Sequence, residues 1–200
     1  LDLAILINGI PFITCELKNE STGQTIVNGM EQYRNHRDPN NRMLKSCLVH
    51  FVADNNRVMM TTKLCGENTM FLPFNINTDN PIIEGKYATS YMWEEIFQAD
   101  SLLNIIQDFI KQYIPRKSKT RERVTIFPRY HQLRCVRRII ADIKEKGNGK
   151  SYLVQHSAGS GKSKSIAWLA HQLSDLFDVE DKPSFDSIIV VTDRIILDKA

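Results

Sequence analysis

Residues 152–163 have the sequence YLVQHSAGSGKS, in which a short apolar run leads into a glycine-rich loop. The apolar run at 152–155 predicts a strand, and residues 162–177 have the periodicity of a helix. Strand, glycine loop and helix in this order are typical of a phosphate-binding loop. Since a second buried strand is predicted at 187–192, this part of the chain is expected to form a parallel α/β sheet.

The loop carries the residue types that phosphate binding needs. Glycines let backbone N–H groups converge on phosphate oxygens without a Cβ in the way, and the following helix N-terminus adds positive potential. We expect Lys162 to face the β- and γ-phosphates of ATP and the Ser163 hydroxyl to ligate Mg²⁺. His156 replaces the first glycine of the standard pattern. The candidate ATP-binding residues of the loop are Gly159, Ser160, Gly161, Lys162 and Ser163.

Two further segments support a nucleotide-driven motor. Gln132 lies upstream of the loop, and its amide carries the donor and acceptor that match the N6/N7 edge of adenine. It resembles the adenine-reading glutamine of superfamily-two helicases and translocases. After the predicted strand at 187–192, Asp193 and Arg194 resemble the motif of that superfamily that touches the nucleic-acid backbone, so both are candidate DNA-binding residues.

The first part of the chain predicts strands and helices in alternation. Strand pairs are expected at residues 1–7 with 10–18 and at 48–53 with 57–63, and helices at 25–36, 91–113 and 130–146. Asn8-Gly9 between the first two runs is a strong hairpin signal.

A second constellation of polar residues lies on the first predicted hairpin. Asp2 and Glu16 are two acids, and Lys18 follows Glu16 by two positions, so that both point to one face of a strand. Two carboxylates suit Mg²⁺, which activates water in phosphodiester cleavage, and a lysine stabilises the developing charge. The alternative is an edge strand with a surface ion pair, a position that Pro11 favours.

Strand parity sets a condition on this site. A two-residue turn at Asn8-Gly9 pairs Ile7 with Ile10 and therefore Asp2 with Cys15, which puts Asp2 on the face opposite Glu16. A three-residue loop, or a bulge between Asp2 and Gly9, brings the two acids to one face. The metal site therefore requires an odd loop or a bulge.

Composition excludes several classes of protein. With 42% hydrophobic and 24% charged residues, the chain is neither disordered nor collagen-like. No apolar run approaches the roughly 18 residues of a membrane span, so no membrane partner is expected. The four cysteines form no CxxC pair, which favours reduced thiols in the cytoplasm over a zinc or disulfide framework.

The positive charge is concentrated in one segment. The net charge is +3, yet residues 115–138 contain nine lysines and arginines against one acid. Such asymmetry predicts a polyanionic partner. The alternative is a solvated linker followed by an exposed helix face.

Together these features resemble one family, the restriction (motor and nuclease) subunit of type I restriction–modification enzymes. The resemblance extends over nearly the whole chain. It is carried by NGIP at 8–11, ELKN at 16–19, EQYR at 31–34, RDP at 37–39, TTKL at 61–64, FLPFN at 71–75, QHSAGSGKS at 155–163 and TDR at 192–194. A histidine before the loop core is usual in that family, which accounts for His156.

The resemblance implies a PD-(D/E)xK nuclease domain followed by RecA-like motor domains. Asp2, Glu16 and Lys18 match the catalytic motif, with Asp2 and Glu16 as metal ligands. In the family's Q-x-x-x-Y motif, Gln32 matches as a catalytic-site residue, whereas His36 occupies the tyrosine position and is expected to approach DNA.

The predicted fold is therefore α/β: a PD-(D/E)xK nuclease-like mixed sheet with helices, then the start of a RecA-like parallel α/β domain. The expected domains are residues 1–114 (nuclease, its N-terminal part missing), 115–123 (basic linker) and 124–200 (a truncated first motor domain). Because the chain begins without methionine and stops in mid-pattern, we expect a piece of a longer protein. The family's remaining motor motifs would follow Ala200, and a further acid of the nuclease site would precede Leu1.

The predicted function is ATP- and Mg²⁺-dependent translocation and cleavage of foreign duplex DNA. The resemblance implies methyltransferase and specificity subunits as partners. The alternatives are a helicase–nuclease of DNA repair, an inactive scaffold for those subunits, or a P-loop ATPase with no role on DNA.

Overall fold

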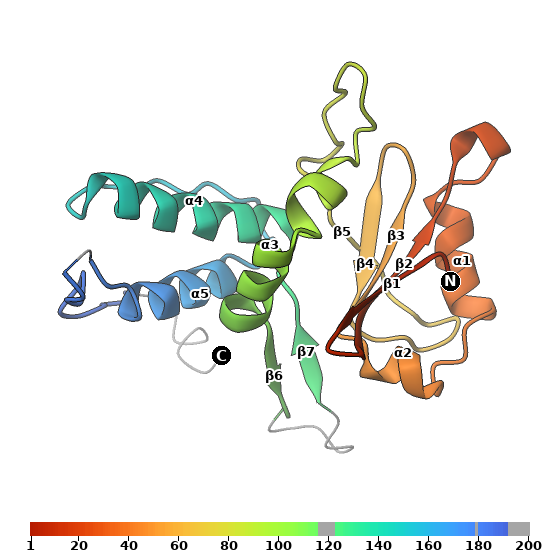
Figure 1. Cartoon of the computed structure of the whole chain (residues 1–200), viewed down its shortest axis with the longest axis horizontal. Coiled ribbons are helices and arrows are strands. Elements are labelled where there is room, and N and C mark those ends of the chain that lie inside the picture. The colour runs from red at the N-terminus through yellow and green to blue at the C-terminus, as the bar shows by residue number, and fades with distance from the viewer. Residues whose placement is uncertain (116–122, 179, 192–200) are drawn as a thin grey trace. The chain divides into compact units, whose positions relative to one another are not determined.

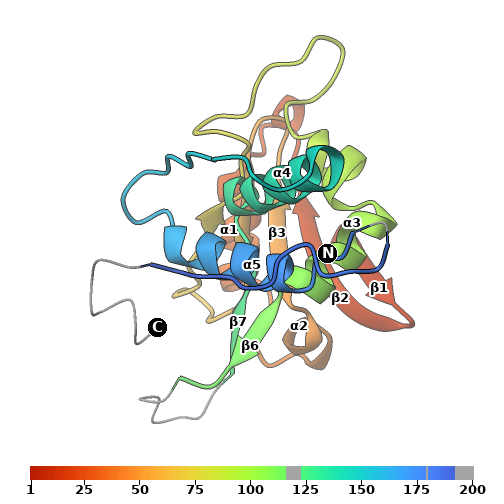
Figure 2. The same ribbon diagram turned by 90° about the vertical axis from the view of Figure 1, so that its left-hand side faces the viewer.

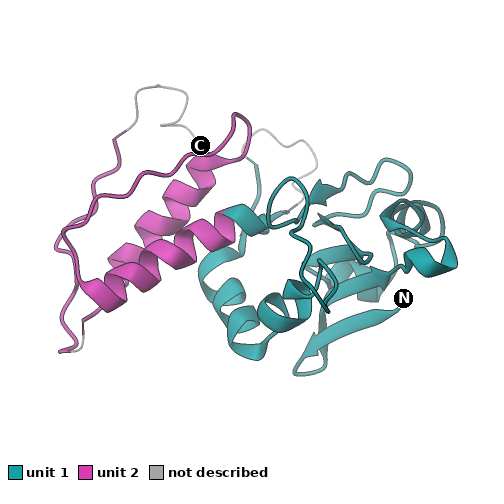
Figure 3. Cartoon of the chain, turned by 90° about the horizontal axis from the view of Figure 1, so that it is seen from above, with its two compact units in different colours: residues 1–131 teal, residues 132–200 magenta. Residues whose placement is uncertain are grey.

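The computed structural model describes residues 1–115, 123–178 and 180–191. The chain divides into two compact units, Leu1–His131 and Gln132–Ala200 (Figure 3). Most of the predicted linker, together with the predicted DNA-contacting pair Asp193 and Arg194, lies outside the described residues. Residues 124–131, assigned from the sequence to the motor domain, pack here with the first unit.

The first unit is built on a mixed sheet of five strands in the order β1-β2-β3-β4-β5 (Figure 1). Its strands are β1 (Leu3–Ile7), β2 (Ile10–Leu17), β3 (Val49–Ala53), β4 (Val58–Thr61) and β5 (Leu72–Pro73). Only β2 and β3 are parallel, because helix α1 (Ile26–Asn35) connects them, and the other neighbours are antiparallel. The predicted mixed sheet with helices is confirmed, and the alternative of an edge position for β2 is wrong, because β2 lies between β1 and β3.

The hairpin of β1 and β2 combines a tight turn with a bulge. Asn8 and Gly9 have positive φ values of 50° and 79°, as a two-residue hairpin turn requires, and Ile7 pairs with Ile10. Farther along, Leu6 pairs with Pro11 but Ile5 pairs with Ile13, so Phe12 is an extra residue in β2. The register then runs Leu3 to Cys15.

Helix α1 covers the sheet face to which Glu16 belongs. Its N-terminus is fixed by a capping box between Thr25 and Asn28, and Asp54 in the β3–β4 turn accepts a 3.0 Å hydrogen bond from the Ile26 N–H. Ile26 and Tyr33 of this helix form a small apolar cluster with Leu44, Val52 and Leu64. The helix approaches the sheet closely at Gly29, where an added Cβ would lie 2.3 Å from Val52 Cγ1.

Replacing Gly29 with alanine is expected to destabilise the first unit by about 1–3 kcal/mol, since overpacking outweighs the gain of about 1 kcal/mol in helix propensity. Hydrogen exchange of peptides from this unit in the whole chain would measure the loss. Combining Gly29→Ala with Val52→Ala removes the clash, so the pair should cost less than the sum of the single changes. A Gly29→Ala chain that is more stable than the parent would contradict this packing.

The other face of the sheet packs against aromatic side chains. Phe51 of β3 contacts the rings of Phe74, Phe97 and Phe127 at centroid distances of 5.2, 5.7 and 5.8 Å. Tyr130 continues the cluster and donates a 3.0 Å hydrogen bond to Glu95. Residues 127–130 are thus part of the core of the first unit.

The single helix predicted over 91–113 is instead two helical segments that end at Phe109, with a break at Phe97 and Gln98, where Gln98 is extended. The first segment is η2 (Met92–Ile96), and the second consists of α3 (Ala99–Asn104) and η3 (Ile105–Phe109). Ile110 turns to an extended conformation, and β6 (Lys111–Tyr113) then pairs with β7 (Val124–Ile126) in a separate two-stranded ribbon (Figure 2). Helix prediction fails at 111–113 because the partner strand comes from a distant part of the sequence. Short helices η1 (Glu20–Thr22) and α2 (Arg42–Ser46) complete the unit.

The second unit contains two helices, α4 (Tyr130–Lys146, which begins in the first unit) and α5 (Lys162–Ser174). Ile139 and Ile143 of α4 pack with Leu176 in its apolar core. The strands predicted at 152–155 and 187–192 are not formed in the described residues. No described strand supplies them with hydrogen-bond partners, and Leu153 and Ile189 are 94% and 82% exposed.

Candidate functional site

Glu16 is the centre of the candidate site in the first unit. It lies near the end of β2, and its side chain is fully buried. The Arg37 guanidinium donates two hydrogen bonds to Glu16 Oε1, at 2.9 Å from Nε and 2.5 Å from Nη2. A carboxylate at this depth is tolerated only when it is paired or ligating, so the burial of Glu16 indicates a specific role.

The second oxygen of Glu16 is a vacant acceptor. Oε2 is buried, and none of the residues that the structure describes forms a hydrogen bond with it. The bulge expected between Asp2 and Gly9 lies instead at Phe12 in β2. It changes the parity of the hairpin all the same, because extending the register by one residue beyond Leu3–Cys15 places Asp2 opposite Glu16. The Asp2 carboxylate accepts a 2.7 Å hydrogen bond from the Leu17 N–H.

These two acids fit a magnesium site of the open type. Among the described residues there is no group of three or more His, Cys, Asp or Glu side chains arranged to hold a metal. Mg²⁺ commonly uses only one or two carboxylates and completes its octahedral shell with water and substrate oxygens. The unpartnered Glu16 Oε2 is the free donor that such an ion requires.

Lys18, two residues after Glu16, is brought together with Gln32 of α1. The Lys18 ammonium donates a 2.7 Å hydrogen bond to Gln32 Oε1 on α1. Gly29, one turn before Gln32, has no side chain and leaves room for the aliphatic part of Lys18. A Cβ built at position 29 would lie 3.4 Å from Lys18 Cγ. His36 is exposed at the C-cap of α1, and its backbone N–H donates to the Gln32 carbonyl. The helix therefore positions Gln32 directly against Lys18.

The structure also places polar residues here to which sequence analysis gave no role. Arg37 holds Glu16, although its only sequence signal was its place in the RDP motif. Thr14, on the same strand face as Glu16, is hydrogen-bonded at 2.7 Å to both the Tyr33 hydroxyl and His50 Nδ1. Burial lowers the pKa of His50 to about 4 and raises that of Tyr33, so both side chains are neutral at pH 7. No spacing rule links these three residues, because they meet only through the sheet and helix.

The second unit carries the phosphate-loop candidate. Gly159 and Gly161 have positive φ values of 73° and 82°, and Gly161 is the N-cap of α5. The Lys162 ammonium donates to the backbone carbonyls of His156 and Ser157 at 2.9 and 3.2 Å. Ser163 is exposed in the first turn of α5. The loop thus has the predicted conformation at its glycines, with its lysine folded back over the loop.

Gln132 is buried against the same loop. Its Nε2 donates to the carbonyls of Ser160 and Gly161 at 3.1 and 3.0 Å. A Cβ at position 161 would lie 2.4 Å from this nitrogen, so the Gln132 side chain would have to shift, and the φ of 82° itself favours glycine. The glutamine therefore ties α4 to the loop, and its role in adenine recognition stays a prediction.

Replacing Gln132 with glutamate is expected to weaken ATP binding by roughly tenfold or more, because a carboxylate would then face two carbonyl oxygens without a donor. Equilibrium binding of ATP to the full-length subunit measures this. Gln132→Ala removes the donors without adding charge and should cost less. Equal affinity of the glutamate variant and the parent would show that these hydrogen bonds do not support the loop.

Comparison with known protein families agrees with this arrangement. Residues 1–69 match the family model of the type I restriction enzyme R protein N terminus, and residues 131–200 match that of the SWI2/SNF2 ATPase. The two matches follow one another in the order of the two candidate sites. The predicted resemblance to the R subunit of type I restriction enzymes is thereby confirmed.

Two curated relatives cover nearly the whole chain. A protein of Methanocaldococcus jannaschii described as the type I restriction enzyme MjaVIIIP endonuclease subunit is 25% identical over 207 residues, which span 96% of this chain and 18% of that protein. The type I restriction enzyme HindI endonuclease subunit of Haemophilus influenzae is 24% identical over 206 residues, with 98% and 19% covered. The chain thus spans about a fifth of the length of the curated relatives it matches.

Proposed function

We propose that this chain is part of an ATP-dependent type I restriction endonuclease subunit that translocates and cleaves foreign duplex DNA. The first unit carries the cleavage site and the second the start of the motor. The single observation that supports cleavage most strongly is the fully buried Glu16 with its unpartnered Oε2. Relatives named as endonuclease subunits over nearly the whole chain point the same way.

The first unit is proposed to be a PD-(D/E)xK nuclease domain. A mixed sheet in which α1 connects the parallel strands β2 and β3 supports this assignment. Asp2 and Glu16 would hold Mg²⁺, which would supply Lewis-acid stabilisation of the phosphodiester and an acidified water. The two acids occupy neighbouring strands, so the geometry of the pair depends on the register of the hairpin.

The remaining residues of this site position and stabilise charge. Arg37 holds Glu16 Oε1 in place and leaves Oε2 as the donor. Gln32 holds the Lys18 ammonium through a neutral acceptor, so the full positive charge of Lys18 is available to a phosphodiester oxygen. His36, exposed at the end of the same helix, is proposed to contact the DNA backbone.

The second unit is proposed to be the beginning of a RecA-like domain that binds Mg²⁺-ATP. The left-handed Gly159 and Gly161 and the N-terminus of α5 are suited to phosphate oxygens. In this proposal Lys162 would leave the loop carbonyls to hold the γ-phosphate of ATP, and the exposed Ser163 hydroxyl would hold the metal. Asp193 and Arg194 are proposed to contact DNA.

The subunit is proposed to act in the cytoplasm with methyltransferase and specificity subunits. Free cysteines are in keeping with a reducing compartment. Among the described residues, no helix has the length and apolar character needed to cross a bilayer.

The test is cleavage of unmodified and modified circular duplex DNA by the full-length subunit, with and without the partner subunits, ATP and Mg²⁺. A restriction subunit should cut only unmodified DNA and only in the complete mixture. Cleavage that ignores modification and needs no partner would favour a repair helicase–nuclease. Complex assembly without any cleavage would favour a scaffold.

A further inference from the structure

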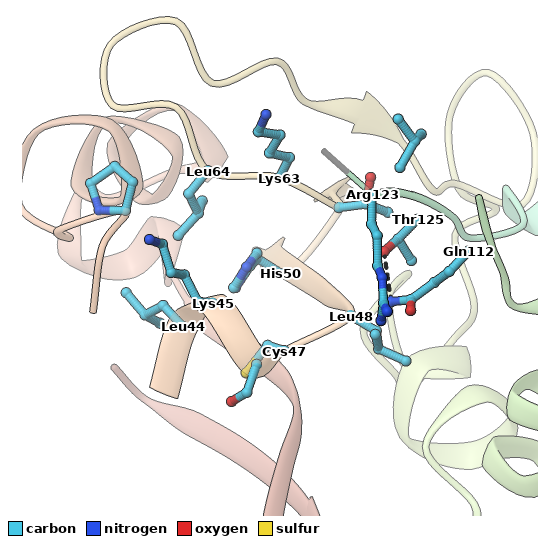
Figure 4. Close-up of a pocket in the computed structure, with 14 residues that line it drawn as sticks. Leu44, Lys45, Cys47, Leu48, His50, Lys63, Leu64, Gln112, Arg123 and Thr125 are labelled. Atoms are coloured by element: carbon cyan, nitrogen blue, oxygen red, sulfur yellow. Dashed lines mark hydrogen bonds between the residues drawn. The ribbon is translucent and has the colours of Figure 1, made fainter. Parts of the chain in front are cut away.

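The first unit contains a cavity of about 600 Å³ that none of the carboxylate-site residues Asp2, Glu16 and Lys18 lines (Figure 4). It is formed by α2 with the residues that follow it, the segment after β4, and the ribbon of β6 and β7. Its volume is within the range of roughly 300–1,000 Å³ that small-molecule sites occupy.

The charged side chains around this cavity are all basic. Lys45, Lys63 and Arg123 contribute to its wall, and its lining as described includes no carboxylate. Neither Lys45 nor Arg123 forms an ion pair with an acidic side chain in the part of the chain that the structure describes. Cations that share one concave space repel one another, and an anion between them relieves the repulsion.

The rest of the lining suits a ligand with polar and apolar parts. Leu44, Leu48 and Leu64 provide apolar surface, while Gln112 and Thr125, joined by a 3.1 Å hydrogen bond, provide polar groups. His50 forms part of the wall and is only 2% exposed. Because burial lowers its pKa to about 4, His50 is neutral at pH 7 and the lysines and arginine carry the charge.

The cavity is separate from the carboxylate site. The connection between them runs through the buried hydroxyl of Thr14, which bonds His50 Nδ1 on one side and lies two residues before Glu16 in β2. Thr14 and Tyr33 are both fully buried, so this connection is a layer of packed side chains. A ligand in the cavity therefore does not occupy the place of the scissile phosphate.

We propose that this cavity is a second phosphate-binding site that takes one nucleotide unit, with its phosphate held by basic side chains of the wall and its sugar and base against the leucines. The nucleotide is either a free nucleoside phosphate or part of a DNA strand, since both present the same chemistry. The proposal depends neither on cleavage nor on ATP hydrolysis.

The test uses the full-length subunit with Lys162→Ala, so that the phosphate loop does not compete for the probes. Amine-reactive labelling read by mass spectrometry reports the accessibility of each lysine with dTMP, thymidine or a short 5′-phosphorylated single-stranded oligonucleotide. Lys45 and Lys63 should become several-fold less reactive with a phosphorylated probe and unchanged with thymidine. Lys111, which is exposed on β6 and does not line the cavity, is the internal reference. Protection by dTMP assigns a free nucleotide, and protection by the oligonucleotide alone assigns a DNA strand.

The affinity of the protecting probe for charge-reversal variants then shows whether binding depends on the cavity residues or only on the net charge of the protein. Lys45→Glu and Arg123→Glu should each weaken binding by roughly tenfold or more, because each removes a charge-assisted hydrogen bond and adds repulsion. Lys111→Glu makes the same change of net charge and should leave the affinity within about twofold. Absence of protection by both phosphorylated probes, or equal effects of the Lys45 and Lys111 variants, would overturn the proposal.

Discussion

DNA cleavage by the full-length subunit is expected to fall by more than about a hundredfold when Glu16 is replaced by glutamine, while ATP hydrolysis continues. Mutation of a residue that only supports a metal ligand already lowers metal affinity or activity by about ten- to a hundredfold. Glu16 is proposed as a direct ligand, so its loss is expected to cost more. Glutamine keeps an oxygen for Arg37 but loses the negative charge and the donor strength of Oε2. Cleavage of circular DNA and ATP turnover, measured in one assembled complex, report the two activities.

Glu31→Gln is the matched control for this experiment. Glu31 is an exposed acid on α1, so the same chemical change is made on the same unit away from the carboxylate site. Its cleavage rate should equal that of the parent. If Glu16→Gln cuts at the parental rate, or loses ATP hydrolysis as well while remaining folded, the first unit does not contain a separate nuclease site.

Lys162→Ala is expected to reduce ATP hydrolysis and DNA translocation by about a thousandfold, and cleavage with them. The change removes the charge that is proposed to face the β- and γ-phosphates, and positioning with electrostatic stabilisation supplies almost all of the catalysis of phosphoryl transfer. Coupled-enzyme measurement of phosphate release and displacement of a DNA triplex by the moving complex report the two steps.

Lys164→Ala tests whether the effect is local. Lys164 is exposed on α5 two residues farther on. Its replacement by alanine removes the same positive charge from the helix but leaves Lys162 in the loop. Near-parental turnover is expected. A Lys162→Ala subunit that cuts DNA normally would mean that cleavage is not driven through this loop.

The turn of the first hairpin could be predicted from its own two residues, whereas the position of its bulge depends on how the two strands pair. The Asn8-Gly9 dipeptide dictates positive φ at both positions, so the turn could be derived from two residues. The requirement for a bulge followed from parity, but its position at Phe12 did not. Pro11 lacks a backbone N–H and therefore interrupts the ladder beside the bulge.

The candidate sites were predictable to the extent that their residues are neighbours in sequence. Glu16 lies at the end of β2 and Lys18 directly follows that strand, while Gly159, Gly161 and Lys162 lie in or at the end of one loop, so spacing alone brought each group together. Arg37 reaches Glu16 from the end of α1, and this contact exists only after the helix has packed on the sheet. The strands expected at 152–155 and 187–192 are not formed in the described residues, although each run is apolar. An apolar run becomes a strand only where a neighbouring strand supplies its hydrogen bonds.

In evolutionary terms, the bulge at Phe12 restricts how this hairpin can change its length. A single-residue insertion or deletion within either strand would turn Asp2 away from Glu16, because side chains alternate between the two faces of a sheet. A change in the Asn8-Gly9 turn leaves the paired residues in place. Among relatives that cleave DNA, the turn is therefore expected to vary freely in length, whereas strand lengths change only by even numbers or by loss of the bulge itself.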